Sequence, residues 1–197
     1  MSSRVSTAAL DAPLAAELVR RRAALSIALL CAGHFAVDLY AGALGALQPL
    51  LVERFGISLT QAGFLGGLLV FSSSVMQPAY GYLSDRVHTR LFTVLGPAVA
   101  GVFISSLGLA PSFVWLLLLV FIGGSGSAAY HPPASARVLL GIEEGRGRAM
   151  AFFVSAGTLG TALGPAYFST VSGWLGFSGT WWAALPGVLV AALLFRV

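Results

Sequence analysis

Residues 24–51 read ALSIALLCAGHFAVDLYAGALGALQPLL, an apolar run with one acidic side chain, Asp38, and no arginine or lysine. A helix needs about 20 consecutive apolar residues to cross the hydrocarbon core of a bilayer, and this run is longer than that. We therefore expect residues 24–51 to form a membrane-spanning helix that carries an ionisable group near the middle of the membrane.

Five more apolar runs of spanning length follow, separated by short connections such as 52–58, 110–112 and 173–179. They are residues 59–83, 91–109, 113–136, 149–172 and 180–195. The chain of 197 residues is 57% hydrophobic and only 9% charged, which lies outside the range of soluble domains. The sequence predicts an all-α membrane protein with six transmembrane helices.

The distribution of arginine predicts the orientation of these spans. All 11 basic residues are arginines, and with the N-terminus inside, only Arg54 falls on the outer side. The others fall in cytoplasmic segments: Arg4, Arg20, Arg21, Arg22, Arg86, Arg90, Arg137, Arg146, Arg148 and Arg196. Under the positive-inside rule both termini are then cytoplasmic. We expect a cytoplasmic N-terminal tail at 1–22 and a six-span domain at 23–197.

The composition also indicates where such a protein resides. The chain lacks lysine and is rich in alanine and glycine, which favours a bacterial inner membrane. Its net charge of +4 marks the cytoplasmic face of a multi-pass protein. We therefore do not expect nucleic acid as a partner.

An internal repeat divides the six spans into two groups of three. QPAYGYLSD, near the end of the second span, resembles GPAYFSTVSG near the end of the fifth, which places Pro78 and Pro165 87 residues apart. The same offset carries the first span onto the fourth and the third onto the sixth. Two inverted three-helix repeats, about 24–109 and 111–196, are the plan of many transporter halves.

The segment GHFAVDLY, residues 33–40, places His34 and Asp38 one helical turn apart on one face of the first span. A charged side chain at mid-membrane costs about 2.5–3.5 kcal/mol, so Asp38 is expected to face protein or water. Intramembrane ionisable groups are functional by default, and we expect this pair to handle protons or substrate. The alternative is a neutral polar pair that only fixes helix contacts.

A second histidine, His131, precedes two prolines in the segment AAYHPPASAR of the fourth span. Pro132 and Pro133 remove backbone donors and are expected to bend the helix. His131 then either lines an internal cavity as a second proton-exchanging group, or caps carbonyl oxygens that the bend sets free.

The loop after the second span, GYLSDRVHTR at 81–90, carries a cluster of charges. Such a cluster commonly anchors the topology. Its spacing, Gly-x-x-x-Asp-Arg with a later arginine, resembles the signature loop between the second and third spans of the major facilitator superfamily. The resemblance implies a cytoplasmic latch between two halves of a transporter, formed by Gly81, Asp85, Arg86 and Arg90.

Three segments narrow the resemblance: GHFAVDLYAGALGALQPLLVERFGISLTQAGFL, SSSVMQPAYGYLSDR and GSGSAAYHPPASAR. Together they are similar to the fosmidomycin-resistance family of efflux transporters, over most of residues 33–137. The resemblance implies a proton-coupled exporter of small molecules that works by alternating access and needs no cofactor. The matching positions are His34, Asp38, Gln48, Gln77 and His131 in a proton and substrate cavity, and Arg137 in the latch.

Some positions depart from the patterns of these transporters. In the loop, His88 and Thr89 replace residues that the superfamily usually has. Ile122 stands near the place of an intramembrane arginine that many drug/proton antiporters carry in the fourth span. In the fifth span, Phe168 and Ser169 replace the closing glycine pair of the antiporter signature.

The rest of that fifth-span signature is present as Gly160, Gly164 and Pro165. Glycines at helical spacing let two membrane helices approach closely. We therefore expect Gly157, Gly160 and Gly164 to be packing positions, whether or not the chain is an antiporter.

A six-span chain corresponds to half of the twelve-span superfamily fold, and this sequence stops at Val197, just after the sixth span. Alone, it would expose the polar face of His34 and Asp38 to lipid, which is unfavourable. We expect a second six-span half as partner, an identical chain or a separate one, besides protons, a small-molecule substrate and the bilayer. The alternative is a non-transporting assembly or regulatory subunit.

A protease is the remaining alternative. GGSG at 123–126 matches the Gly-x-Ser-Gly motif of rhomboid intramembrane proteases, with Ser125 as nucleophile. A serine nucleophile needs a base within hydrogen-bond reach, but the sixth span has no histidine and His131 lies on the helix of Ser125. We therefore expect no enzyme, and the lone Cys31 leads us to expect no metal cluster.

Overall fold

The computed structural model describes residues 7–87, 90–142 and 144–196, and these residues form helices and short connections without strands. Six helical segments are long and apolar enough to cross a membrane: Glu17–Phe55, Leu59–Val87, Leu91–Leu109, Phe113–Val138, Arg146–Leu175 and Phe177–Arg196. The six-span prediction is confirmed. The first part of the expected tail, residues 1–6, lies outside the described residues, as do His88, Thr89 and Val197.

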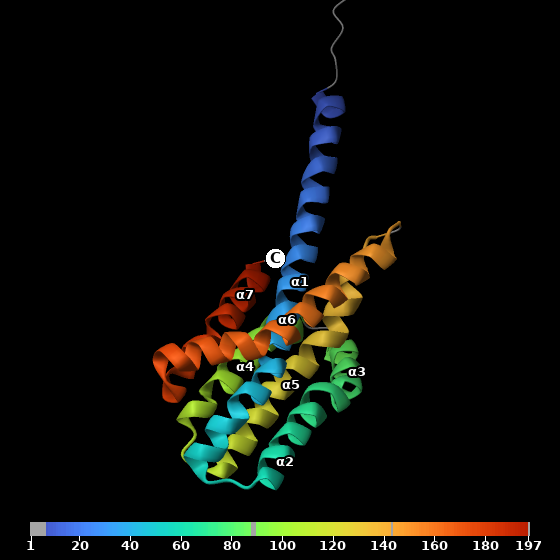
Figure 1. Cartoon of the computed structure of the whole chain (residues 1–197). Helices are drawn as coiled ribbons and strands as arrows, with labels where there is room; N and C mark the ends of the chain where they lie inside the picture. Colours follow the sequence, from blue (N-terminus) through green and yellow to red (C-terminus); the bar gives the residue numbers. More distant parts are fainter. Residues whose placement is uncertain (1–6, 88–89, 143, 197) are drawn as a thin grey trace, which may run out of the picture.

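Span one is a single long helix, α1 (Thr7–Phe55), of 49 residues. It continues through the position where the sequence analysis divides tail from membrane domain, and the backbone has no break there. Figure 1 shows its N-terminal part extending well beyond the rest of the bundle. The described part of the expected tail is therefore helical.

Span two is composite, with α2 (Leu59–Val70), a π-helical turn η1 (Phe71–Val75) and α3 (Gln77–Val87). Its start is fixed by a capping box, in which Ser58 Oγ accepts the Gln61 amide and the Gln61 side chain accepts the Ser58 amide. In the π turn the buried Ser72 donates its hydroxyl to the Leu69 carbonyl at 3.2 Å. The sequence pattern gave no sign of this irregular turn.

The remaining spans begin and end close to the expected positions. Span three is α4 (Leu91–Ser105) with the 3₁₀ turn η2 (Ser106–Leu109), and span four is α5 (Phe113–Val138). Span five is α6 (Arg146–Leu175), and span six is the 3₁₀ segment η3 (Phe177–Ala184) with α7 (Leu185–Arg196). The expected connection at 173–179 is wrong in extent, because Gly176, at a φ of +72°, is the single residue between α6 and η3.

The packing of the spans follows the predicted repeat. α1 packs along α6, so span one lies against span five, and α5 packs against α2, η1 and α3, so span four lies against span two. The offset of 87 residues carries span one onto span four and span two onto span five. The repeat therefore relates the contact between spans one and five to the contact between spans four and two. α4 and α7, spans three and six, also pack against each other, as expected for two inverted units of three helices.

Glycines on α6 make its close contact with α1 possible. A Cβ atom at Gly160 would overlap the carbonyl group of Phe35, and one at Gly164 would overlap the backbone of Leu39 and Gly42. Both glycines therefore lie where the backbones of α6 and α1 approach each other closely.

Tyr40 ties α1 to the last span from inside the core. Its hydroxyl donates to the carbonyl oxygen of Ala183 at 3.0 Å and accepts the amide of Gly187 at 2.8 Å. Because Tyr40 is fully buried, these bonds replace the water that its hydroxyl would otherwise need.

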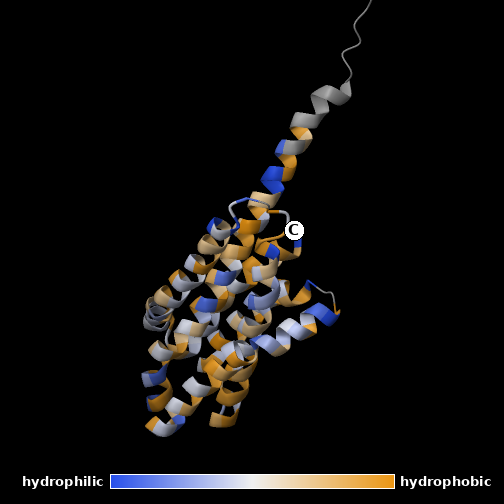
Figure 2. Ribbon diagram, turned by 90° about the vertical axis from the view of Figure 1, so that its right-hand side faces the viewer, coloured by the Kyte–Doolittle hydropathy of each residue, from blue (hydrophilic) through white to orange (hydrophobic). Residues whose placement is uncertain are grey.

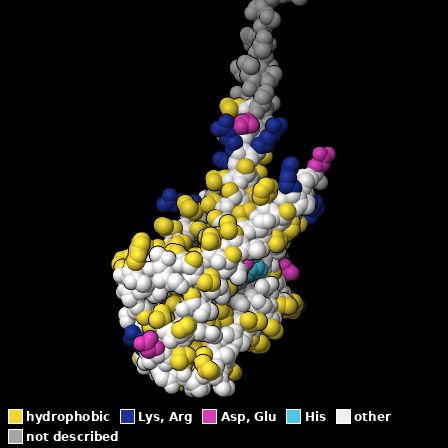
Figure 3. Space-filling model, viewed as in Figure 1, with side chains coloured by type: hydrophobic (Ala, Val, Ile, Leu, Met, Phe, Trp, Pro, Cys, Tyr) yellow, Lys and Arg dark blue, Asp and Glu magenta, His cyan; other side chains and the backbone are white. Residues whose placement is uncertain are grey.

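The surface of the bundle is apolar along its length and charged at its ends. Large hydrophobic side chains such as Phe64, Phe152 and Leu189 are exposed, which is expected for a lipid-facing surface. Figure 2 shows the hydrophobic colour dominating the bundle, with hydrophilic residues on the protruding part of α1. Figure 3 shows dark blue basic side chains gathered near the protruding end of α1. We call the end of the bundle from which α1 protrudes the arginine-rich end. Glu53 and Arg54 lie at the opposite end.

Candidate functional site

The structure brings His34, Asp38 and His131 together inside the bundle. His34 Nε2 lies 3.2 Å from one carboxylate oxygen of Asp38, and His131 Nε2 lies 3.2 Å from the other. The contact between His34 and Asp38, one helical turn apart on α1, is the one predicted from their spacing. The exposed fractions of the three side chains are 9%, 19% and 19% in chain order. We call this group the His–Asp–His triad.

Backbone carbonyls fix the orientation of both imidazole rings. Nδ1 of His34 lies 2.7 Å from the carbonyl oxygen of Phe153 on α6, and Nδ1 of His131 lies 2.7 Å from that of Ser127 on α5. Since a carbonyl oxygen only accepts hydrogen bonds, each Nδ1 carries a proton and donates it. In a neutral ring the Nε2 atom is then a bare acceptor, and both Nε2 atoms face the carboxyl group of Asp38.

This tautomer determines how many protons the contacts within the triad require. A bare Nε2 and a carboxylate oxygen both present lone pairs, so a contact at 3.2 Å becomes a hydrogen bond only when a proton lies between them. The proton resides on the imidazole or on the carboxyl group. Two such contacts accommodate two protons, which gives the triad a net charge of +1, while with one proton it is neutral.

His131 meets only one of the two expectations for it. Pro132 and Pro133 leave the carbonyls of Ala128 and Ala129 without their usual amide donors, but the ring of His131 contacts Ser127. α5 also continues through both prolines to Val138. His131 therefore lies in the triad and does not cap the carbonyls that the prolines set free.

Two residues of α6 complete the surroundings of the triad. The ring of Phe153 stacks on that of His34, with centroids 4.1 Å apart and planes at 30°. A Cβ atom at Gly157 would overlap His34 Nε2 and the Asp38 carboxylate, so only glycine leaves room for the triad. The sequence analysis treated Gly157 as a packing residue and did not single out Phe153; the one signal was that Gly157 belongs to the glycine series of span five.

The donor atoms of the triad are also of the types that ligate transition metals. One ligand atom from each of His34, Asp38 and His131 can be chosen so that all lie within 4.8 Å of one another. The sequence analysis expected no metal because it considered cysteine alone, and it did not foresee that two histidines and a carboxylate converge. By donor type and spacing, these three residues could hold a metal ion.

An open cavity of about 490 Å³ adjoins the triad between α3, α5 and α6. Its lining includes His131, Phe153, Gln77 and Ser135. Figure 3 shows histidine atoms, in cyan, at the bottom of a hollow beside α6. The triad is therefore accessible from this cavity, and Gln77, one of the expected cavity residues, lies on its wall.

Gln48, the other expected cavity glutamine, lies elsewhere. Its side-chain amide donates to the carbonyl oxygen of Ala62 at 3.1 Å, which joins α1 to α2. It is not among the residues that line the cavity beside the triad. The structure thus separates Gln48 from the group with which the sequence analysis placed it.

The expected latch residues have contacts with different elements. Arg90 donates to the carbonyl oxygen of Phe195 at 3.1 Å, at the end of α7, and Arg86 lies over the ring of Tyr82 at 4.9 Å. A Cβ atom at Gly81 would lie 3.3 Å from Pro132, so α3 approaches α5 closely there. Among the described residues, Asp85 has no ion-pair partner.

The remaining expected residues have different surroundings. Arg137, in the last turn of α5, lines a separate cavity between α1, α5 and α7. Pro165 is exposed within α6. Ser125 Oγ is buried and has no hydrogen-bond partner among the described residues, so the structure offers it no base for a protease reaction.

Comparison with known proteins agrees with this architecture. Residues 30–197 match the model of the Major Facilitator Superfamily. The chain belongs to the Major Facilitator Superfamily. It is accordingly a multi-pass membrane protein of a transporter family and not an enzyme.

Several curated superfamily members resemble this chain. It is 29% identical to an uncharacterized transporter, YfnC, of Bacillus subtilis over 83% of this chain. It is 28% identical to the fosmidomycin resistance protein of Escherichia coli, also over 83%, and 30% identical to human protein spinster homolog 1 over 88%. The match covers 40%, 40% and 33% of these relatives, so the chain spans less than half of their length.

Proposed function

We propose that this chain is one six-span half of a proton-coupled secondary transporter that exports a small molecule by alternating access. The observation that carries the proposal is the His–Asp–His triad at mid-membrane, which joins α1, α5 and α6 through contacts of 2.7 to 3.2 Å. A charge retained at this depth is costly and is usually kept for function.

The geometry of the triad supports protons as the coupling ion. Its two contacts to Asp38 hold one or two protons, so the triad alternates between neutral and +1 without a change of fold. The adjoining cavity gives protons and substrate a route to His131. Export of a small molecule agrees with the name of one relative, the fosmidomycin resistance protein.

The same site supports the proposal that a second six-span half is present. A transporter of this kind binds its substrate near the membrane midplane, at the interface between repeats or halves. The cavity beside the triad is open in the six-span bundle, and lipid is a poor neighbour for ionisable groups. In this proposal, six further spans cover the cavity, supplied by an identical or a different chain.

We place the arginine-rich end in the cytoplasm of a bacterium, with both termini on that side. The residues at the α3–α4 connection, Asp85, Arg86 and Arg90, and Arg137 on α5 then face the cytoplasm. In this arrangement Asp85, without an ion-pair partner among the described residues, is available to bind a basic residue of the second half. Such a contact would close the cytoplasmic side in one state of the cycle.

The decisive experiment measures uptake of radiolabelled fosmidomycin into inside-out vesicles of an Escherichia coli strain that lacks its own resistance protein. In these vesicles export appears as uptake. Where an identical chain supplies the second half, we expect an acid interior to drive accumulation in vesicles that contain this chain. Asp38→Asn should abolish gradient-driven accumulation while preserving exchange of labelled for unlabelled drug, because the fold is retained and only the proton site is lost.

The matched control is Glu53→Gln, the same carboxylate-to-amide change at an exposed position at the opposite end of the bundle. We expect it to accumulate the drug like the unchanged chain. Gradient-driven accumulation by Asp38→Asn would refute the proton role. If a metal ion held the triad together instead, a chelator would abolish accumulation in the unchanged chain.

A further inference from the structure

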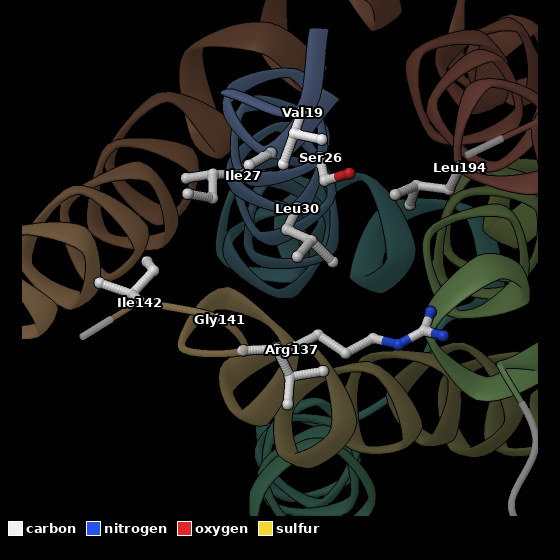
Figure 4. Close-up of a pocket in the computed structure, with 10 residues that line it drawn as sticks. Val19, Ser26, Ile27, Leu30, Arg137, Gly141, Ile142 and Leu194 are labelled. Carbon is white, nitrogen blue, oxygen red and sulfur yellow. The ribbon is translucent and has the colours of Figure 1, made fainter. Parts of the chain in front are cut away.

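A second cavity, of about 400 Å³, lies at the arginine-rich end, away from the triad. It is bordered by α1, the end of α5 with the turn that follows, and Leu194 of α7. Gly141, at a φ of +71°, lets the chain turn back along the cavity after α5. Figure 4 shows Arg137 extending along one side of this space, opposite Ser26 and Leu30 of α1.

The walls of this cavity have two kinds of chemistry. Along α1 the lining residues are Val19, Ala23, Ser26, Ile27 and Leu30, which lie on one helical face. Their stripe is about 16 Å long at the α-helical rise, and Ser26 is its one polar member. Across the space, Arg137 is the one charged residue among the described residues of the lining, none of which is acidic.

Arg137 has its guanidinium available for a ligand. None of the ion pairs and hydrogen bonds between described side chains involves it. The guanidinium fork presents several N–H donors in one plane, which matches the oxygens of a phosphate group. A ligand of this cavity therefore combines an anionic head with a hydrocarbon chain.

The position of the cavity indicates which kind of amphiphilic molecule can bind in it. It lies where α1 leaves the apolar bundle, next to Arg20, Arg21 and Arg22, and Glu17 is already bound to Arg21 at 2.8 Å. Basic pockets between membrane helices at such a level bind anionic lipid head groups. A soluble phosphate would leave the long aliphatic stripe of α1 unused.

We infer that this cavity binds one anionic phospholipid of the adjacent leaflet, with its phosphate on Arg137 and an acyl chain along the α1 stripe. The lipid bridges α1, α5 and α7 at the arginine-rich end. This inference does not depend on the direction or the coupling of transport, because it concerns a site separate from the triad.

Native mass spectrometry of the purified full chain tests the inference, with phosphatidylglycerol and phosphatidylcholine of matched acyl chains as probes. We expect one phosphatidylglycerol per chain to be retained with a preference of about fivefold over phosphatidylcholine, the effect of one basic residue near a membrane surface. Arg137→Gln should abolish the preference. Arg148→Gln, an exposed arginine at the same end that does not line the cavity, should retain it.

A second variant tests the apolar part of the site. Ser26→Phe places an aromatic ring in the space for the acyl chain and leaves Arg137 in place, so lipid retention should fall although the charge remains. The circular dichroism spectrum and thermal stability of each variant verify that it is folded. An unchanged preference in Arg137→Gln, or none in the unchanged chain, would overturn the inference. Displacement of the lipid by millimolar glycerol phosphate would also overturn it, in favour of a site for soluble anions.

Discussion

Two positions related by the internal repeat have opposite surroundings. The offset of 87 residues carries Asp38 of α1 onto Ser125 of α5, and His34 onto Phe121. Asp38 has two imidazole partners at 3.2 Å and is partly accessible. Ser125 Oγ is buried without a hydrogen-bond partner in the described part of the chain.

This difference shows that the two repeats share a backbone plan but not the same polar contacts. α1 and α5 occupy equivalent places, yet the carboxyl group resides on α1, and α5 contributes His131 from a position equivalent to Leu44. A carboxyl group that served only helix packing could equally be found at both positions. The asymmetry therefore favours a chemical role for Asp38.

The largest effect is expected from copying the charge into the other repeat. Ser125→Asp places a carboxyl group where the structure provides no partner, at a cost of about 2.5–3.5 kcal/mol for a charge at the helix centre. We expect a large loss of thermal stability and of folded protein in the membrane, measured by a fluorescence-detected melting curve in detergent. A stable Ser125→Asp chain would show that α5 has a polar environment like that of Asp38.

The next effect concerns the contact that holds α1 against α6. Gly160→Ala adds a Cβ atom that overlaps the Phe35 carbonyl, and overpacking of this kind costs about 1–3 kcal/mol. We expect a lower melting temperature and weaker proton coupling, because α6 also supplies the Phe153 carbonyl to His34. Gly45→Ala is the control, since its Cβ would meet nothing within 4 Å. An equal response of the two variants would contradict the close contact.

An effect on transport, with a smaller effect on stability, is expected from removing one of the two imidazoles. His131→Gln leaves Asp38 with His34 alone, and a hydrogen bond to a charged group contributes about 1.5–3 kcal/mol. We expect gradient-driven transport to fall by about tenfold to a hundredfold, less than in Asp38→Asn, when initial rates of vesicle uptake are compared. Full activity in this variant would show that the contact between α1 and α5 is not part of coupling.

The smallest effect is expected from Ser125→Ala. A buried hydroxyl without a partner retains a desolvation cost that its removal relieves, so the melting temperature is expected to stay the same or to rise slightly. Transport should also be unchanged. A marked loss of activity with normal stability would mean that Ser125 binds substrate or water, and the contrast with Asp38 would weaken.

Local pattern predicted the parts of this fold that depend on hydropathy and helical spacing. The six spans follow from their apolar length, and the contact between His34 and Asp38 follows from a spacing of four residues. The place of Gly160 and Gly164 between two helices could be predicted because glycine at helical spacing has one common use in membranes.

The parts that depend on how helices cross were not predictable in the same way. His131 reaches Asp38 only because α5 crosses α1 at that level, and Phe153 contributes a backbone atom that no residue type reveals. Gln48 carried the same expectation as Gln77 but is held by Ala62 on α2. Side-chain type gives the chemistry of a position, whereas the crossing of helices decides which positions meet.

The π-helical turn in span two has a mechanical consequence. A π turn replaces the regular hydrogen-bond ladder for one turn and is a common cause of helix bending. Here it lies between α2, which is anchored by its capping box, and α3, which carries Gln77 on the cavity wall and leads to Asp85 and Arg86. Span two therefore contains a built-in joint between α2 and α3, at which the regular helical hydrogen bonding is interrupted.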